Sequence, residues 1–119
     1  MSTAASWILG IGLSVAFTLA GYAKVSDQGV MVKARNHLGL PADVYRTIGA
    51  AELVGAIGLL SGLVSGLEVV GVSAALGLVV LMVAAVGYHM RAGDALTEAI
   101  PAVALLLLCL IYIAVKTLG

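Results

Sequence analysis

Four long apolar runs constrain the fold of this chain more than any other feature of its sequence. They cover residues 4–23, 44–64, 69–88 and about 98–116. Each run is long enough, or nearly so, to cross roughly 30 Å of hydrocarbon as a helix. A helix is required because lipid offers no hydrogen-bond partners to the backbone. We therefore predict an all-α fold in which residues 1–119 form a single domain, a four-helix transmembrane bundle.

The composition agrees with a membrane protein. Of the 119 residues, 62% are hydrophobic and 10% are charged, whereas about 25% of residues are charged in soluble domains. The formal net charge is zero and no basic tract occurs, so nucleic acid is not expected as a partner. Cys109 is the only cysteine, which excludes an intramolecular disulfide and a cysteine metal cluster.

The first apolar run also has one property of a secretory signal peptide, because Gly21-Tyr22-Ala23 offers small residues at a cleavage site. Signal peptides begin with a positively charged region, yet no lysine or arginine precedes this run. We therefore expect the run to remain as a membrane span.

The connection between the first two runs has the pattern of a short amphipathic helix. One face is apolar and another is basic or polar: Val30, Met31, Ala34, His37 and Leu38 against Lys33, Arg35 and Asn36. Ser26 or Asp27 is the expected N-cap, and Gly39 with Pro41 ends the helix. Such a helix suits the membrane interface.

The positions of lysine and arginine predict the orientation. The first and third connections, with the adjoining ends of the spans, carry five of these residues and the opposite side carries one: Lys24, Lys33, Arg35, Arg46 and Arg91 against Lys116. Because such residues gather on the cytoplasmic side, we expect both connections in the cytoplasm and both termini outside. We expect a multi-pass protein of a bacterial plasma membrane.

Small residues recur at four-residue spacing in the spans. Gly58 and Gly62 are followed in register by Gly66, and Gly71 is followed by Ala75. Such rows let helix backbones approach closely. In a four-span chain we expect them to pack the spans against one another.

Glu52 is the residue that a membrane span tolerates least. It lies eight residues after Val44, about 12 Å along a helix, and an acid at the centre of a span costs about 2.5–3.5 kcal/mol. Two interpretations are open. The carboxyl is hydrogen-bonded to a neighbouring helix for structure alone, or it lines a pocket.

Other polar residues gather on the same half of the predicted bundle. They are Tyr22, Lys24, Tyr45, Tyr88, His89, Arg91, Asp94 and Glu98. They are either interfacial anchors and an aromatic belt, or parts of a site. In the second case Glu52, His89 and Asp94 are the candidates for proton transfer.

A small hydrophobic ligand would lie between the helix faces of Glu52 and of His89. Met82, Tyr88, Tyr22, Lys24 and Arg91 are the candidate ligand-binding residues. A metal is not expected, because the histidines and carboxylates lack HxxxH or ExxH spacing.

The order of these features resembles the DoxX-like family of small four-helix integral membrane proteins. The resemblance rests on five segments in register with the four spans. They are Ala20-Gly21-Tyr22-Ala23-Lys24, Leu38-Gly39-Leu40-Pro41, Ile48-Gly49-Ala50-Ala51-Glu52-Leu53 with Gly58-Leu59-Leu60, Gly87-Tyr88-His89-Met90-Arg91-Ala92-Gly93-Asp94, and Pro101 in the last span.

The family takes its name from a subunit linked to quinone-dependent thiosulfate oxidation, and other members are tied to membrane redox and thiol-stress systems. The resemblance therefore implies a membrane redox-associated subunit that holds a quinone at Lys24, Glu52 and His89. Its expected partners are membrane lipid, the small hydrophobic ligand, a redox partner protein and other copies of itself in a homo-oligomer. The chain supplies no redox centre of its own.

Three alternatives remain open from the residues. The first is a cofactor-free enzyme, an isomerase or an epoxide-opening enzyme, in which Glu52 acts with His89 or Asp94 as acid and base while Arg91 stabilises negative charge. The second is a proton-coupled exporter. The third is an assembly subunit without a ligand.

Overall fold

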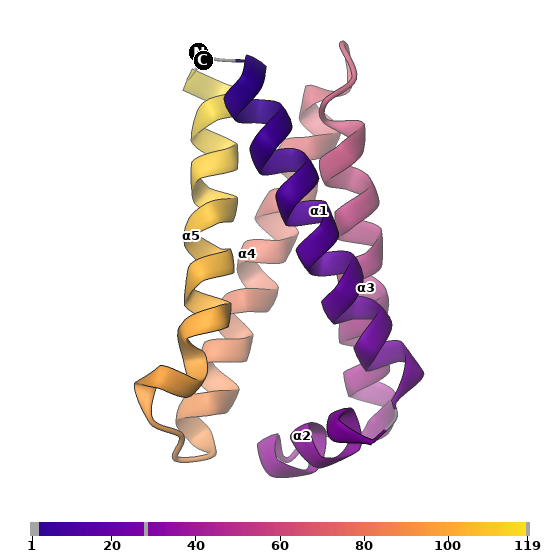
Figure 1. The fold of residues 1–119 in the computed structure, drawn as a ribbon, viewed down its shortest axis with the longest axis vertical. Helices are drawn as coiled ribbons and strands as arrows, with labels where there is room; N and C mark the ends of the chain where they lie inside the picture. The colour runs from indigo at the N-terminus through magenta and orange to yellow at the C-terminus, as the bar shows by residue number, and fades with distance from the viewer. Residues whose placement is uncertain (1–2, 28, 119) are drawn as a thin grey trace.

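The computed structural model describes residues 3–27 and 29–118. Within them the chain is all-helical, with five helices: α1 (Thr3–Ser26), α2 (Val30–Leu38), α3 (Ala42–Ser61), α4 (Glu68–Arg91) and α5 (Leu96–Leu118) (Figure 1). All but α2 are long and apolar enough to cross a membrane. The predicted four-span bundle with a short additional helix is confirmed.

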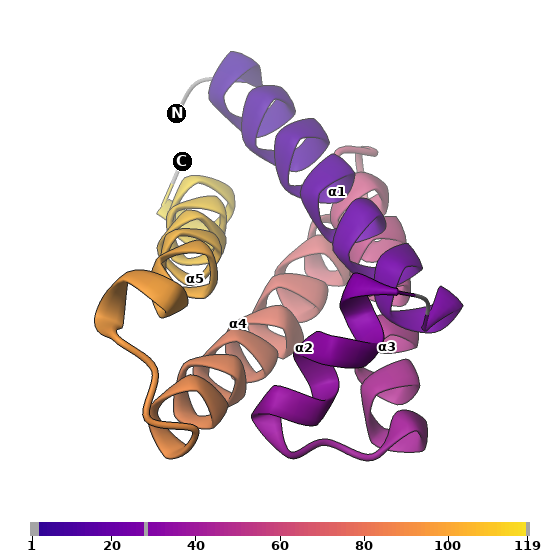
Figure 2. The same ribbon diagram turned by 60° about the horizontal axis from the view of Figure 1, so that its bottom comes forward.

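The four spans form two arms that separate toward one end. α1 packs along α3, α3 against α4, and α4 along α5. α1 and α5 lie near each other where the two termini meet, and they diverge toward the opposite end, where α2 crosses the bundle (Figures 1 and 2). One arm is therefore the α1–α3 pair and the other is the α4–α5 pair.

Glycines bring the backbones of the first arm into contact. A Cβ atom on Gly21 would lie 2.6 Å from the Gly49 carbonyl oxygen, and one on Gly49 would lie 2.7 Å from the Gly21 carbonyl oxygen. Any larger residue at either position would push α1 from α3. Nearby, the Ser14 hydroxyl donates a hydrogen bond of 3.0 Å to the Ala56 carbonyl.

The two arms are joined tightly at the end that holds the termini. A Cβ atom on Gly62 would lie 2.5 Å from the Gly71 Cα atom, so α3 and α4 meet there through their backbones. The buried Tyr112 of α5 donates a hydrogen bond of 2.9 Å to the Leu59 carbonyl. The predicted rows of small residues thus pack the spans internally. Gly66 is an exception, because it lies in the α3–α4 turn with a φ of 90°.

The core and the outer surface of the bundle are both apolar. Phe17, Leu59 and Tyr112 are fully buried between the helices. Large side chains such as Ile8 and Val80 are more than two-thirds exposed, as expected for helix faces that contact lipid.

The predicted N-cap of α2 is wrong. The helix follows Gly29 (φ 52°) and has no side-chain cap, while Ser26 is the last residue of α1. Asp27 is also in the left-handed region, with a φ of 48°. Its carboxylate accepts hydrogen bonds from Arg35 and does not cap α2. The end of α2 is as predicted, with Gly39 in the left-handed conformation.

Candidate ligand cavity

A cavity of about 500 Å³ lies between the diverging spans and is closed at one end by α2. Its lining is mainly alanine, leucine, isoleucine and valine from all five helices and the α2–α3 connection. Its polar and ionisable lining residues are Lys24, Tyr45, Glu52, Tyr88, His89 and Glu98. An apolar cavity of this size with a few polar groups is typical of a small-molecule site.

The deepest polar feature of the cavity is an ion pair between α1 and α3. The Lys24 Nζ atom lies 2.8 Å from the Glu52 Oε1 atom, and the two side chains are 21% and 1% exposed. The ammonium also lies 5.7 Å from the centre of the Tyr45 ring, within the range of a cation–π contact.

The local sequence explains why this pair forms. Lys24 and Glu52 each follow one of the contacting glycines, Gly21 and Gly49, by three residues, so both lie close to the α1–α3 contact. Side chains on a helix lean toward its N-terminus. Because α1 and α3 are antiparallel (Figure 1), the two side chains lean toward each other.

A second polar cluster holds the C-terminal end of α2 against the α4–α5 connection. Asp94 joins two histidines, through Oδ2 to His89 Nδ1 at 2.7 Å and through Oδ1 to His37 Nε2 at 2.6 Å. The hydrogen bonds from His89 and His37 hold the pKa of the Asp94 carboxyl below its ordinary value. Arg91 adds a hydrogen bond of 3.2 Å to the Leu38 carbonyl.

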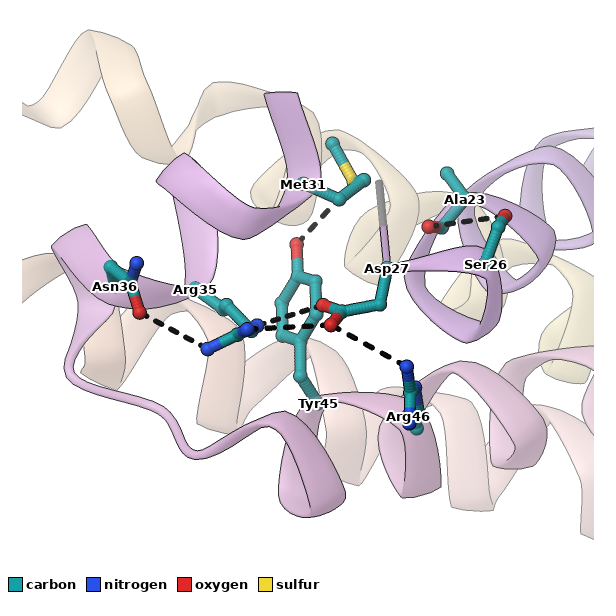
Figure 3. Close-up of polar contacts among 8 residues, drawn as sticks. All are labelled: Ala23, Ser26, Asp27, Met31, Arg35, Asn36, Tyr45 and Arg46. Carbon is teal, nitrogen blue, oxygen red and sulfur yellow. Dashed lines mark hydrogen bonds and ion pairs between the residues drawn. The ribbon is translucent and has the colours of Figure 1, made fainter. Parts of the chain in front are cut away.

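A third cluster fastens the N-terminal part of α2 to α3 (Figure 3). Arg35 donates to Asp27, with Nε 2.7 Å from Oδ1, and Arg46 of α3 lies 3.6 Å from the other carboxylate oxygen. The Tyr45 hydroxyl donates to the Met31 sulfur at 3.6 Å. With both ends held in this way, α2 is a fixed cover over the cavity.

The structure brings most of the predicted site residues together. Lys24, Glu52, Met82, Tyr88 and His89 line the cavity. Asp94 contacts His89 from outside the lining. Arg91 lies with its guanidinium 4.8 Å from the centre of the Tyr88 ring, and it is not a lining residue either. Tyr22 is 68% exposed and does not line the cavity, because it is two residues before Lys24 and on another helix face.

Three contributors were not among the residues predicted for proton transfer or ligand binding, although Tyr45 and Glu98 belong to the polar group that the sequence places on this half of the bundle. Tyr45 lines the cavity, and its signal was present, because Tyr45, Ile48 and Glu52 share one helix face. His37 joins the Asp94 cluster, but the two residues are 57 positions apart and no local pattern connects them. Glu98, at the start of α5, lines the mouth of the cavity.

The arrangement offers two kinds of chemistry. The Lys24–Glu52 pair places a hydrogen-bond donor and an acceptor in an otherwise apolar wall. His89 is oriented through Nδ1 by a carboxylate, and its Nε2 atom has no hydrogen-bond partner among residues 3–27 and 29–118. An imidazole held in this way is suited to proton transfer. No group of three histidine, cysteine or acidic side chains in the same residues is arranged for a metal ion.

The fold is that of a small four-span membrane protein with a cavity between its spans that is covered by a short helix. The model of the DoxX-like family matches residues 8–111 of the chain. Because the match covers most of the sequence, the chain belongs to the DoxX-like family. Neither the curated proteins nor the solved structures gave a significant match.

Proposed function

We propose that this protein binds a small, predominantly apolar molecule with one polar end, of the quinone-like class, in the cavity. The observation that carries the proposal is an apolar cavity of about 500 Å³ with the Lys24–Glu52 pair in its wall. The apolar lining matches a hydrophobic ligand, and the ion pair gives its polar end a place to bind.

The residues present fit a quinone. A quinone is neutral. The Lys24–Glu52 pair has no net charge, so it does not favour a charged ligand over a neutral one. The Lys24 ammonium has N–H groups to donate to a ring carbonyl. In a membrane redox role the protein would hold the quinone while a partner protein carried electrons, since the thiol of Cys109 is fully buried.

Binding is tested with purified full-length protein in phosphatidylcholine nanodiscs and decylubiquinone as the probe. Ala85 lines the cavity, so Ala85→Trp should place an indole ring in it and obstruct binding. Ala104 is exposed on α5, and Ala104→Trp is the matched control. We expect decylubiquinone to raise the melting temperature of the wild type and of Ala104→Trp but not of Ala85→Trp. Equal shifts in all three, or no shift in the wild type, would contradict the proposal.

The His89–Asp94 hydrogen bond favours one second candidate, a cofactor-free isomerase or epoxide-opening enzyme. In this case His89 is the acid and base in the cavity wall, and Asp94 positions its ring, because both carboxylate oxygens are engaged by histidines. An apolar aryl epoxide supplied to proteoliposomes is the test substrate. The enzyme hypothesis expects turnover by the wild type and loss of turnover in His89→Gln, with unchanged melting. Absence of turnover by the wild type counts against it.

A further inference from the structure

Glu52 lines the cavity with a carboxylate whose Oε1 atom is paired with Lys24. Its side chain is 1% exposed. Its Oε1 atom is buried and accepts no hydrogen bond of ordinary geometry from residues 3–27 and 29–118. Lys24 Nζ is close, at 2.8 Å, so the charges are paired but the contact lacks the alignment of a hydrogen bond. A carboxylate has about four acceptor sites, so Glu52 can accept a further hydrogen bond beside Lys24.

No other polar side chain in the lining satisfies this atom. The Tyr45 hydroxyl donates to the Met31 sulfur instead. His89 and Tyr88 are in the last turn of α4, whereas Glu52 is ten residues into α3, about 15 Å from that end of the bundle. At the level of Glu52 the cavity wall therefore has a charged donor and a carboxylate acceptor side by side.

The pairing of these two atoms selects among polar groups of a ligand. A hydroxyl both donates and accepts, so one hydroxyl can accept from Lys24 and donate to the Glu52 carboxylate. A carbonyl or an ether only accepts and gives the carboxylate no hydrogen bond. A carboxylate adds a second negative charge beside Glu52 in an apolar surrounding, which is unfavourable.

We infer that the cavity selects neutral amphiphiles that carry a hydroxyl at their polar end, such as phenols, hydroquinones and alcohols, over the matching ethers, carbonyls and carboxylic acids. The inference rests on the proposed binding function and names the class of ligand within it. For a quinone-like ligand, the favoured form is the reduced dihydroxy form.

A matched series of probes tests this selectivity. Para-octylphenol, its methyl ether para-octylanisole, and para-octylbenzoic acid share one apolar tail. Their affinities for the full-length protein are measured calorimetrically in phosphatidylcholine nanodiscs, with the Ala85→Trp protein as a blank for partition into lipid. A hydrogen bond to a charged group is stronger than one between neutral groups. We therefore expect the phenol to bind at least roughly tenfold more tightly than the anisole, and the acid to bind more weakly than the phenol.

A variant without the ion pair is the internal control. Lys24→Met combined with Glu52→Leu replaces the pair by apolar side chains, a change that proteins commonly tolerate. This variant should lose the preference for the phenol and bind the phenol and the anisole with equal affinity.

The outcomes distinguish failure of the hydroxyl selectivity from failure of ligand binding. Equal affinities for phenol and anisole in the wild type, or a phenol preference that persists in the double variant, overturn the hydroxyl selectivity and leave the binding cavity intact. Failure of all three probes to bind beyond the blank overturns the proposed binding function and the selectivity with it.

Discussion

At the scale of single residues, the two members of the Lys24–Glu52 pair differ in how far their side chains are exposed. Glu52 is enclosed, whereas about a fifth of the Lys24 side chain is exposed. A lysine near the end of a span can extend toward the head groups, but the carboxylate has no such route. Loss of the partner should therefore cost more free energy for the charged Glu52 side chain than for the charged Lys24 side chain.

This asymmetry predicts unequal effects of breaking the pair. Lys24→Met leaves a buried, uncompensated carboxylate and should reduce the free energy of unfolding by about 3–5 kcal/mol. Glu52→Gln leaves the more exposed partner and should cost about 1–3 kcal/mol. Unfolding by dodecyl sulfate in mixed micelles measures both.

The double variant Lys24→Met/Glu52→Leu tests whether the effects of the two single substitutions depend on each other. Its free energy of unfolding should lie within about 1 kcal/mol of the wild type, because removing both charges leaves neither orphaned. Additive losses from the two sites would show that the ion pair does not couple them.

At the scale of elements, the close contact of α1 and α3 depends on two glycines. Gly21→Ala should place a Cβ atom against the Gly49 carbonyl oxygen and cost about 1–3 kcal/mol of stability through overpacking. Gly12 is on the same helix with open space around it, so Gly12→Ala is the matched control and should change stability by no more than about 1 kcal/mol. Equal effects at the two positions would contradict a backbone contact.

The attachment of α2 should depend on pH through Asp94. Its pKa is lowered by His89 and His37. The stabilisation is therefore complete above the ordinary aspartate value of 3.8 and is lost as the pH falls through the lowered value. Hydrogen exchange at the C-terminal amides of α2, beside His37, should accelerate in that acidic range.

Asp94→Asn provides the comparison for this effect. The amide cannot form the same charged contacts, so the C-terminal amides of α2 should exchange faster already at neutral pH and should show no further acidic step from this site. An unchanged acidic step in Asp94→Asn would assign it to other groups.

The sequence predicts those features of the helices that depend on neighbouring residues, and it does not predict those that depend on contacts between distant parts of the chain. The spans follow from runs of apolar residues, and the end of α2 follows from Gly39, because both signals are local. The start of α2 was mispredicted because Asp27 is engaged by Arg35 and Arg46 rather than by the helix end. The contact of His37 with Asp94 depends on how the arms are placed, and adjacent residues do not determine it.

At the scale of the whole molecule, the end covered by α2 should face the cytoplasm. It carries Lys33, Arg35, Arg46 and Arg91, whereas Lys116 lies at the other end. Alkaline phosphatase fused after Gly119 should be active in bacterial cells, and green fluorescent protein at the same point should be dark. The opposite result would reverse the orientation. Removing positive charges from α2 should weaken the preference for the α2 end to lie in the cytoplasm.

The backbone contact of Gly62 with Gly71 joins the two arms of the bundle near one end, so the arms can rotate relative to each other about this contact. From Gly71 to His89 the helix runs about 27 Å, so a change of about 5° in the crossing of α3 and α4 shifts the far end by about 2 Å. Rotation of the arms by this angle would accommodate a ligand ring that is wider or narrower by this amount, and it would leave the Tyr112–Leu59 hydrogen bond near the Gly62–Gly71 contact in place. The stiffness of the α2 attachments, and not the core, would then set the widest molecule that the protein accepts.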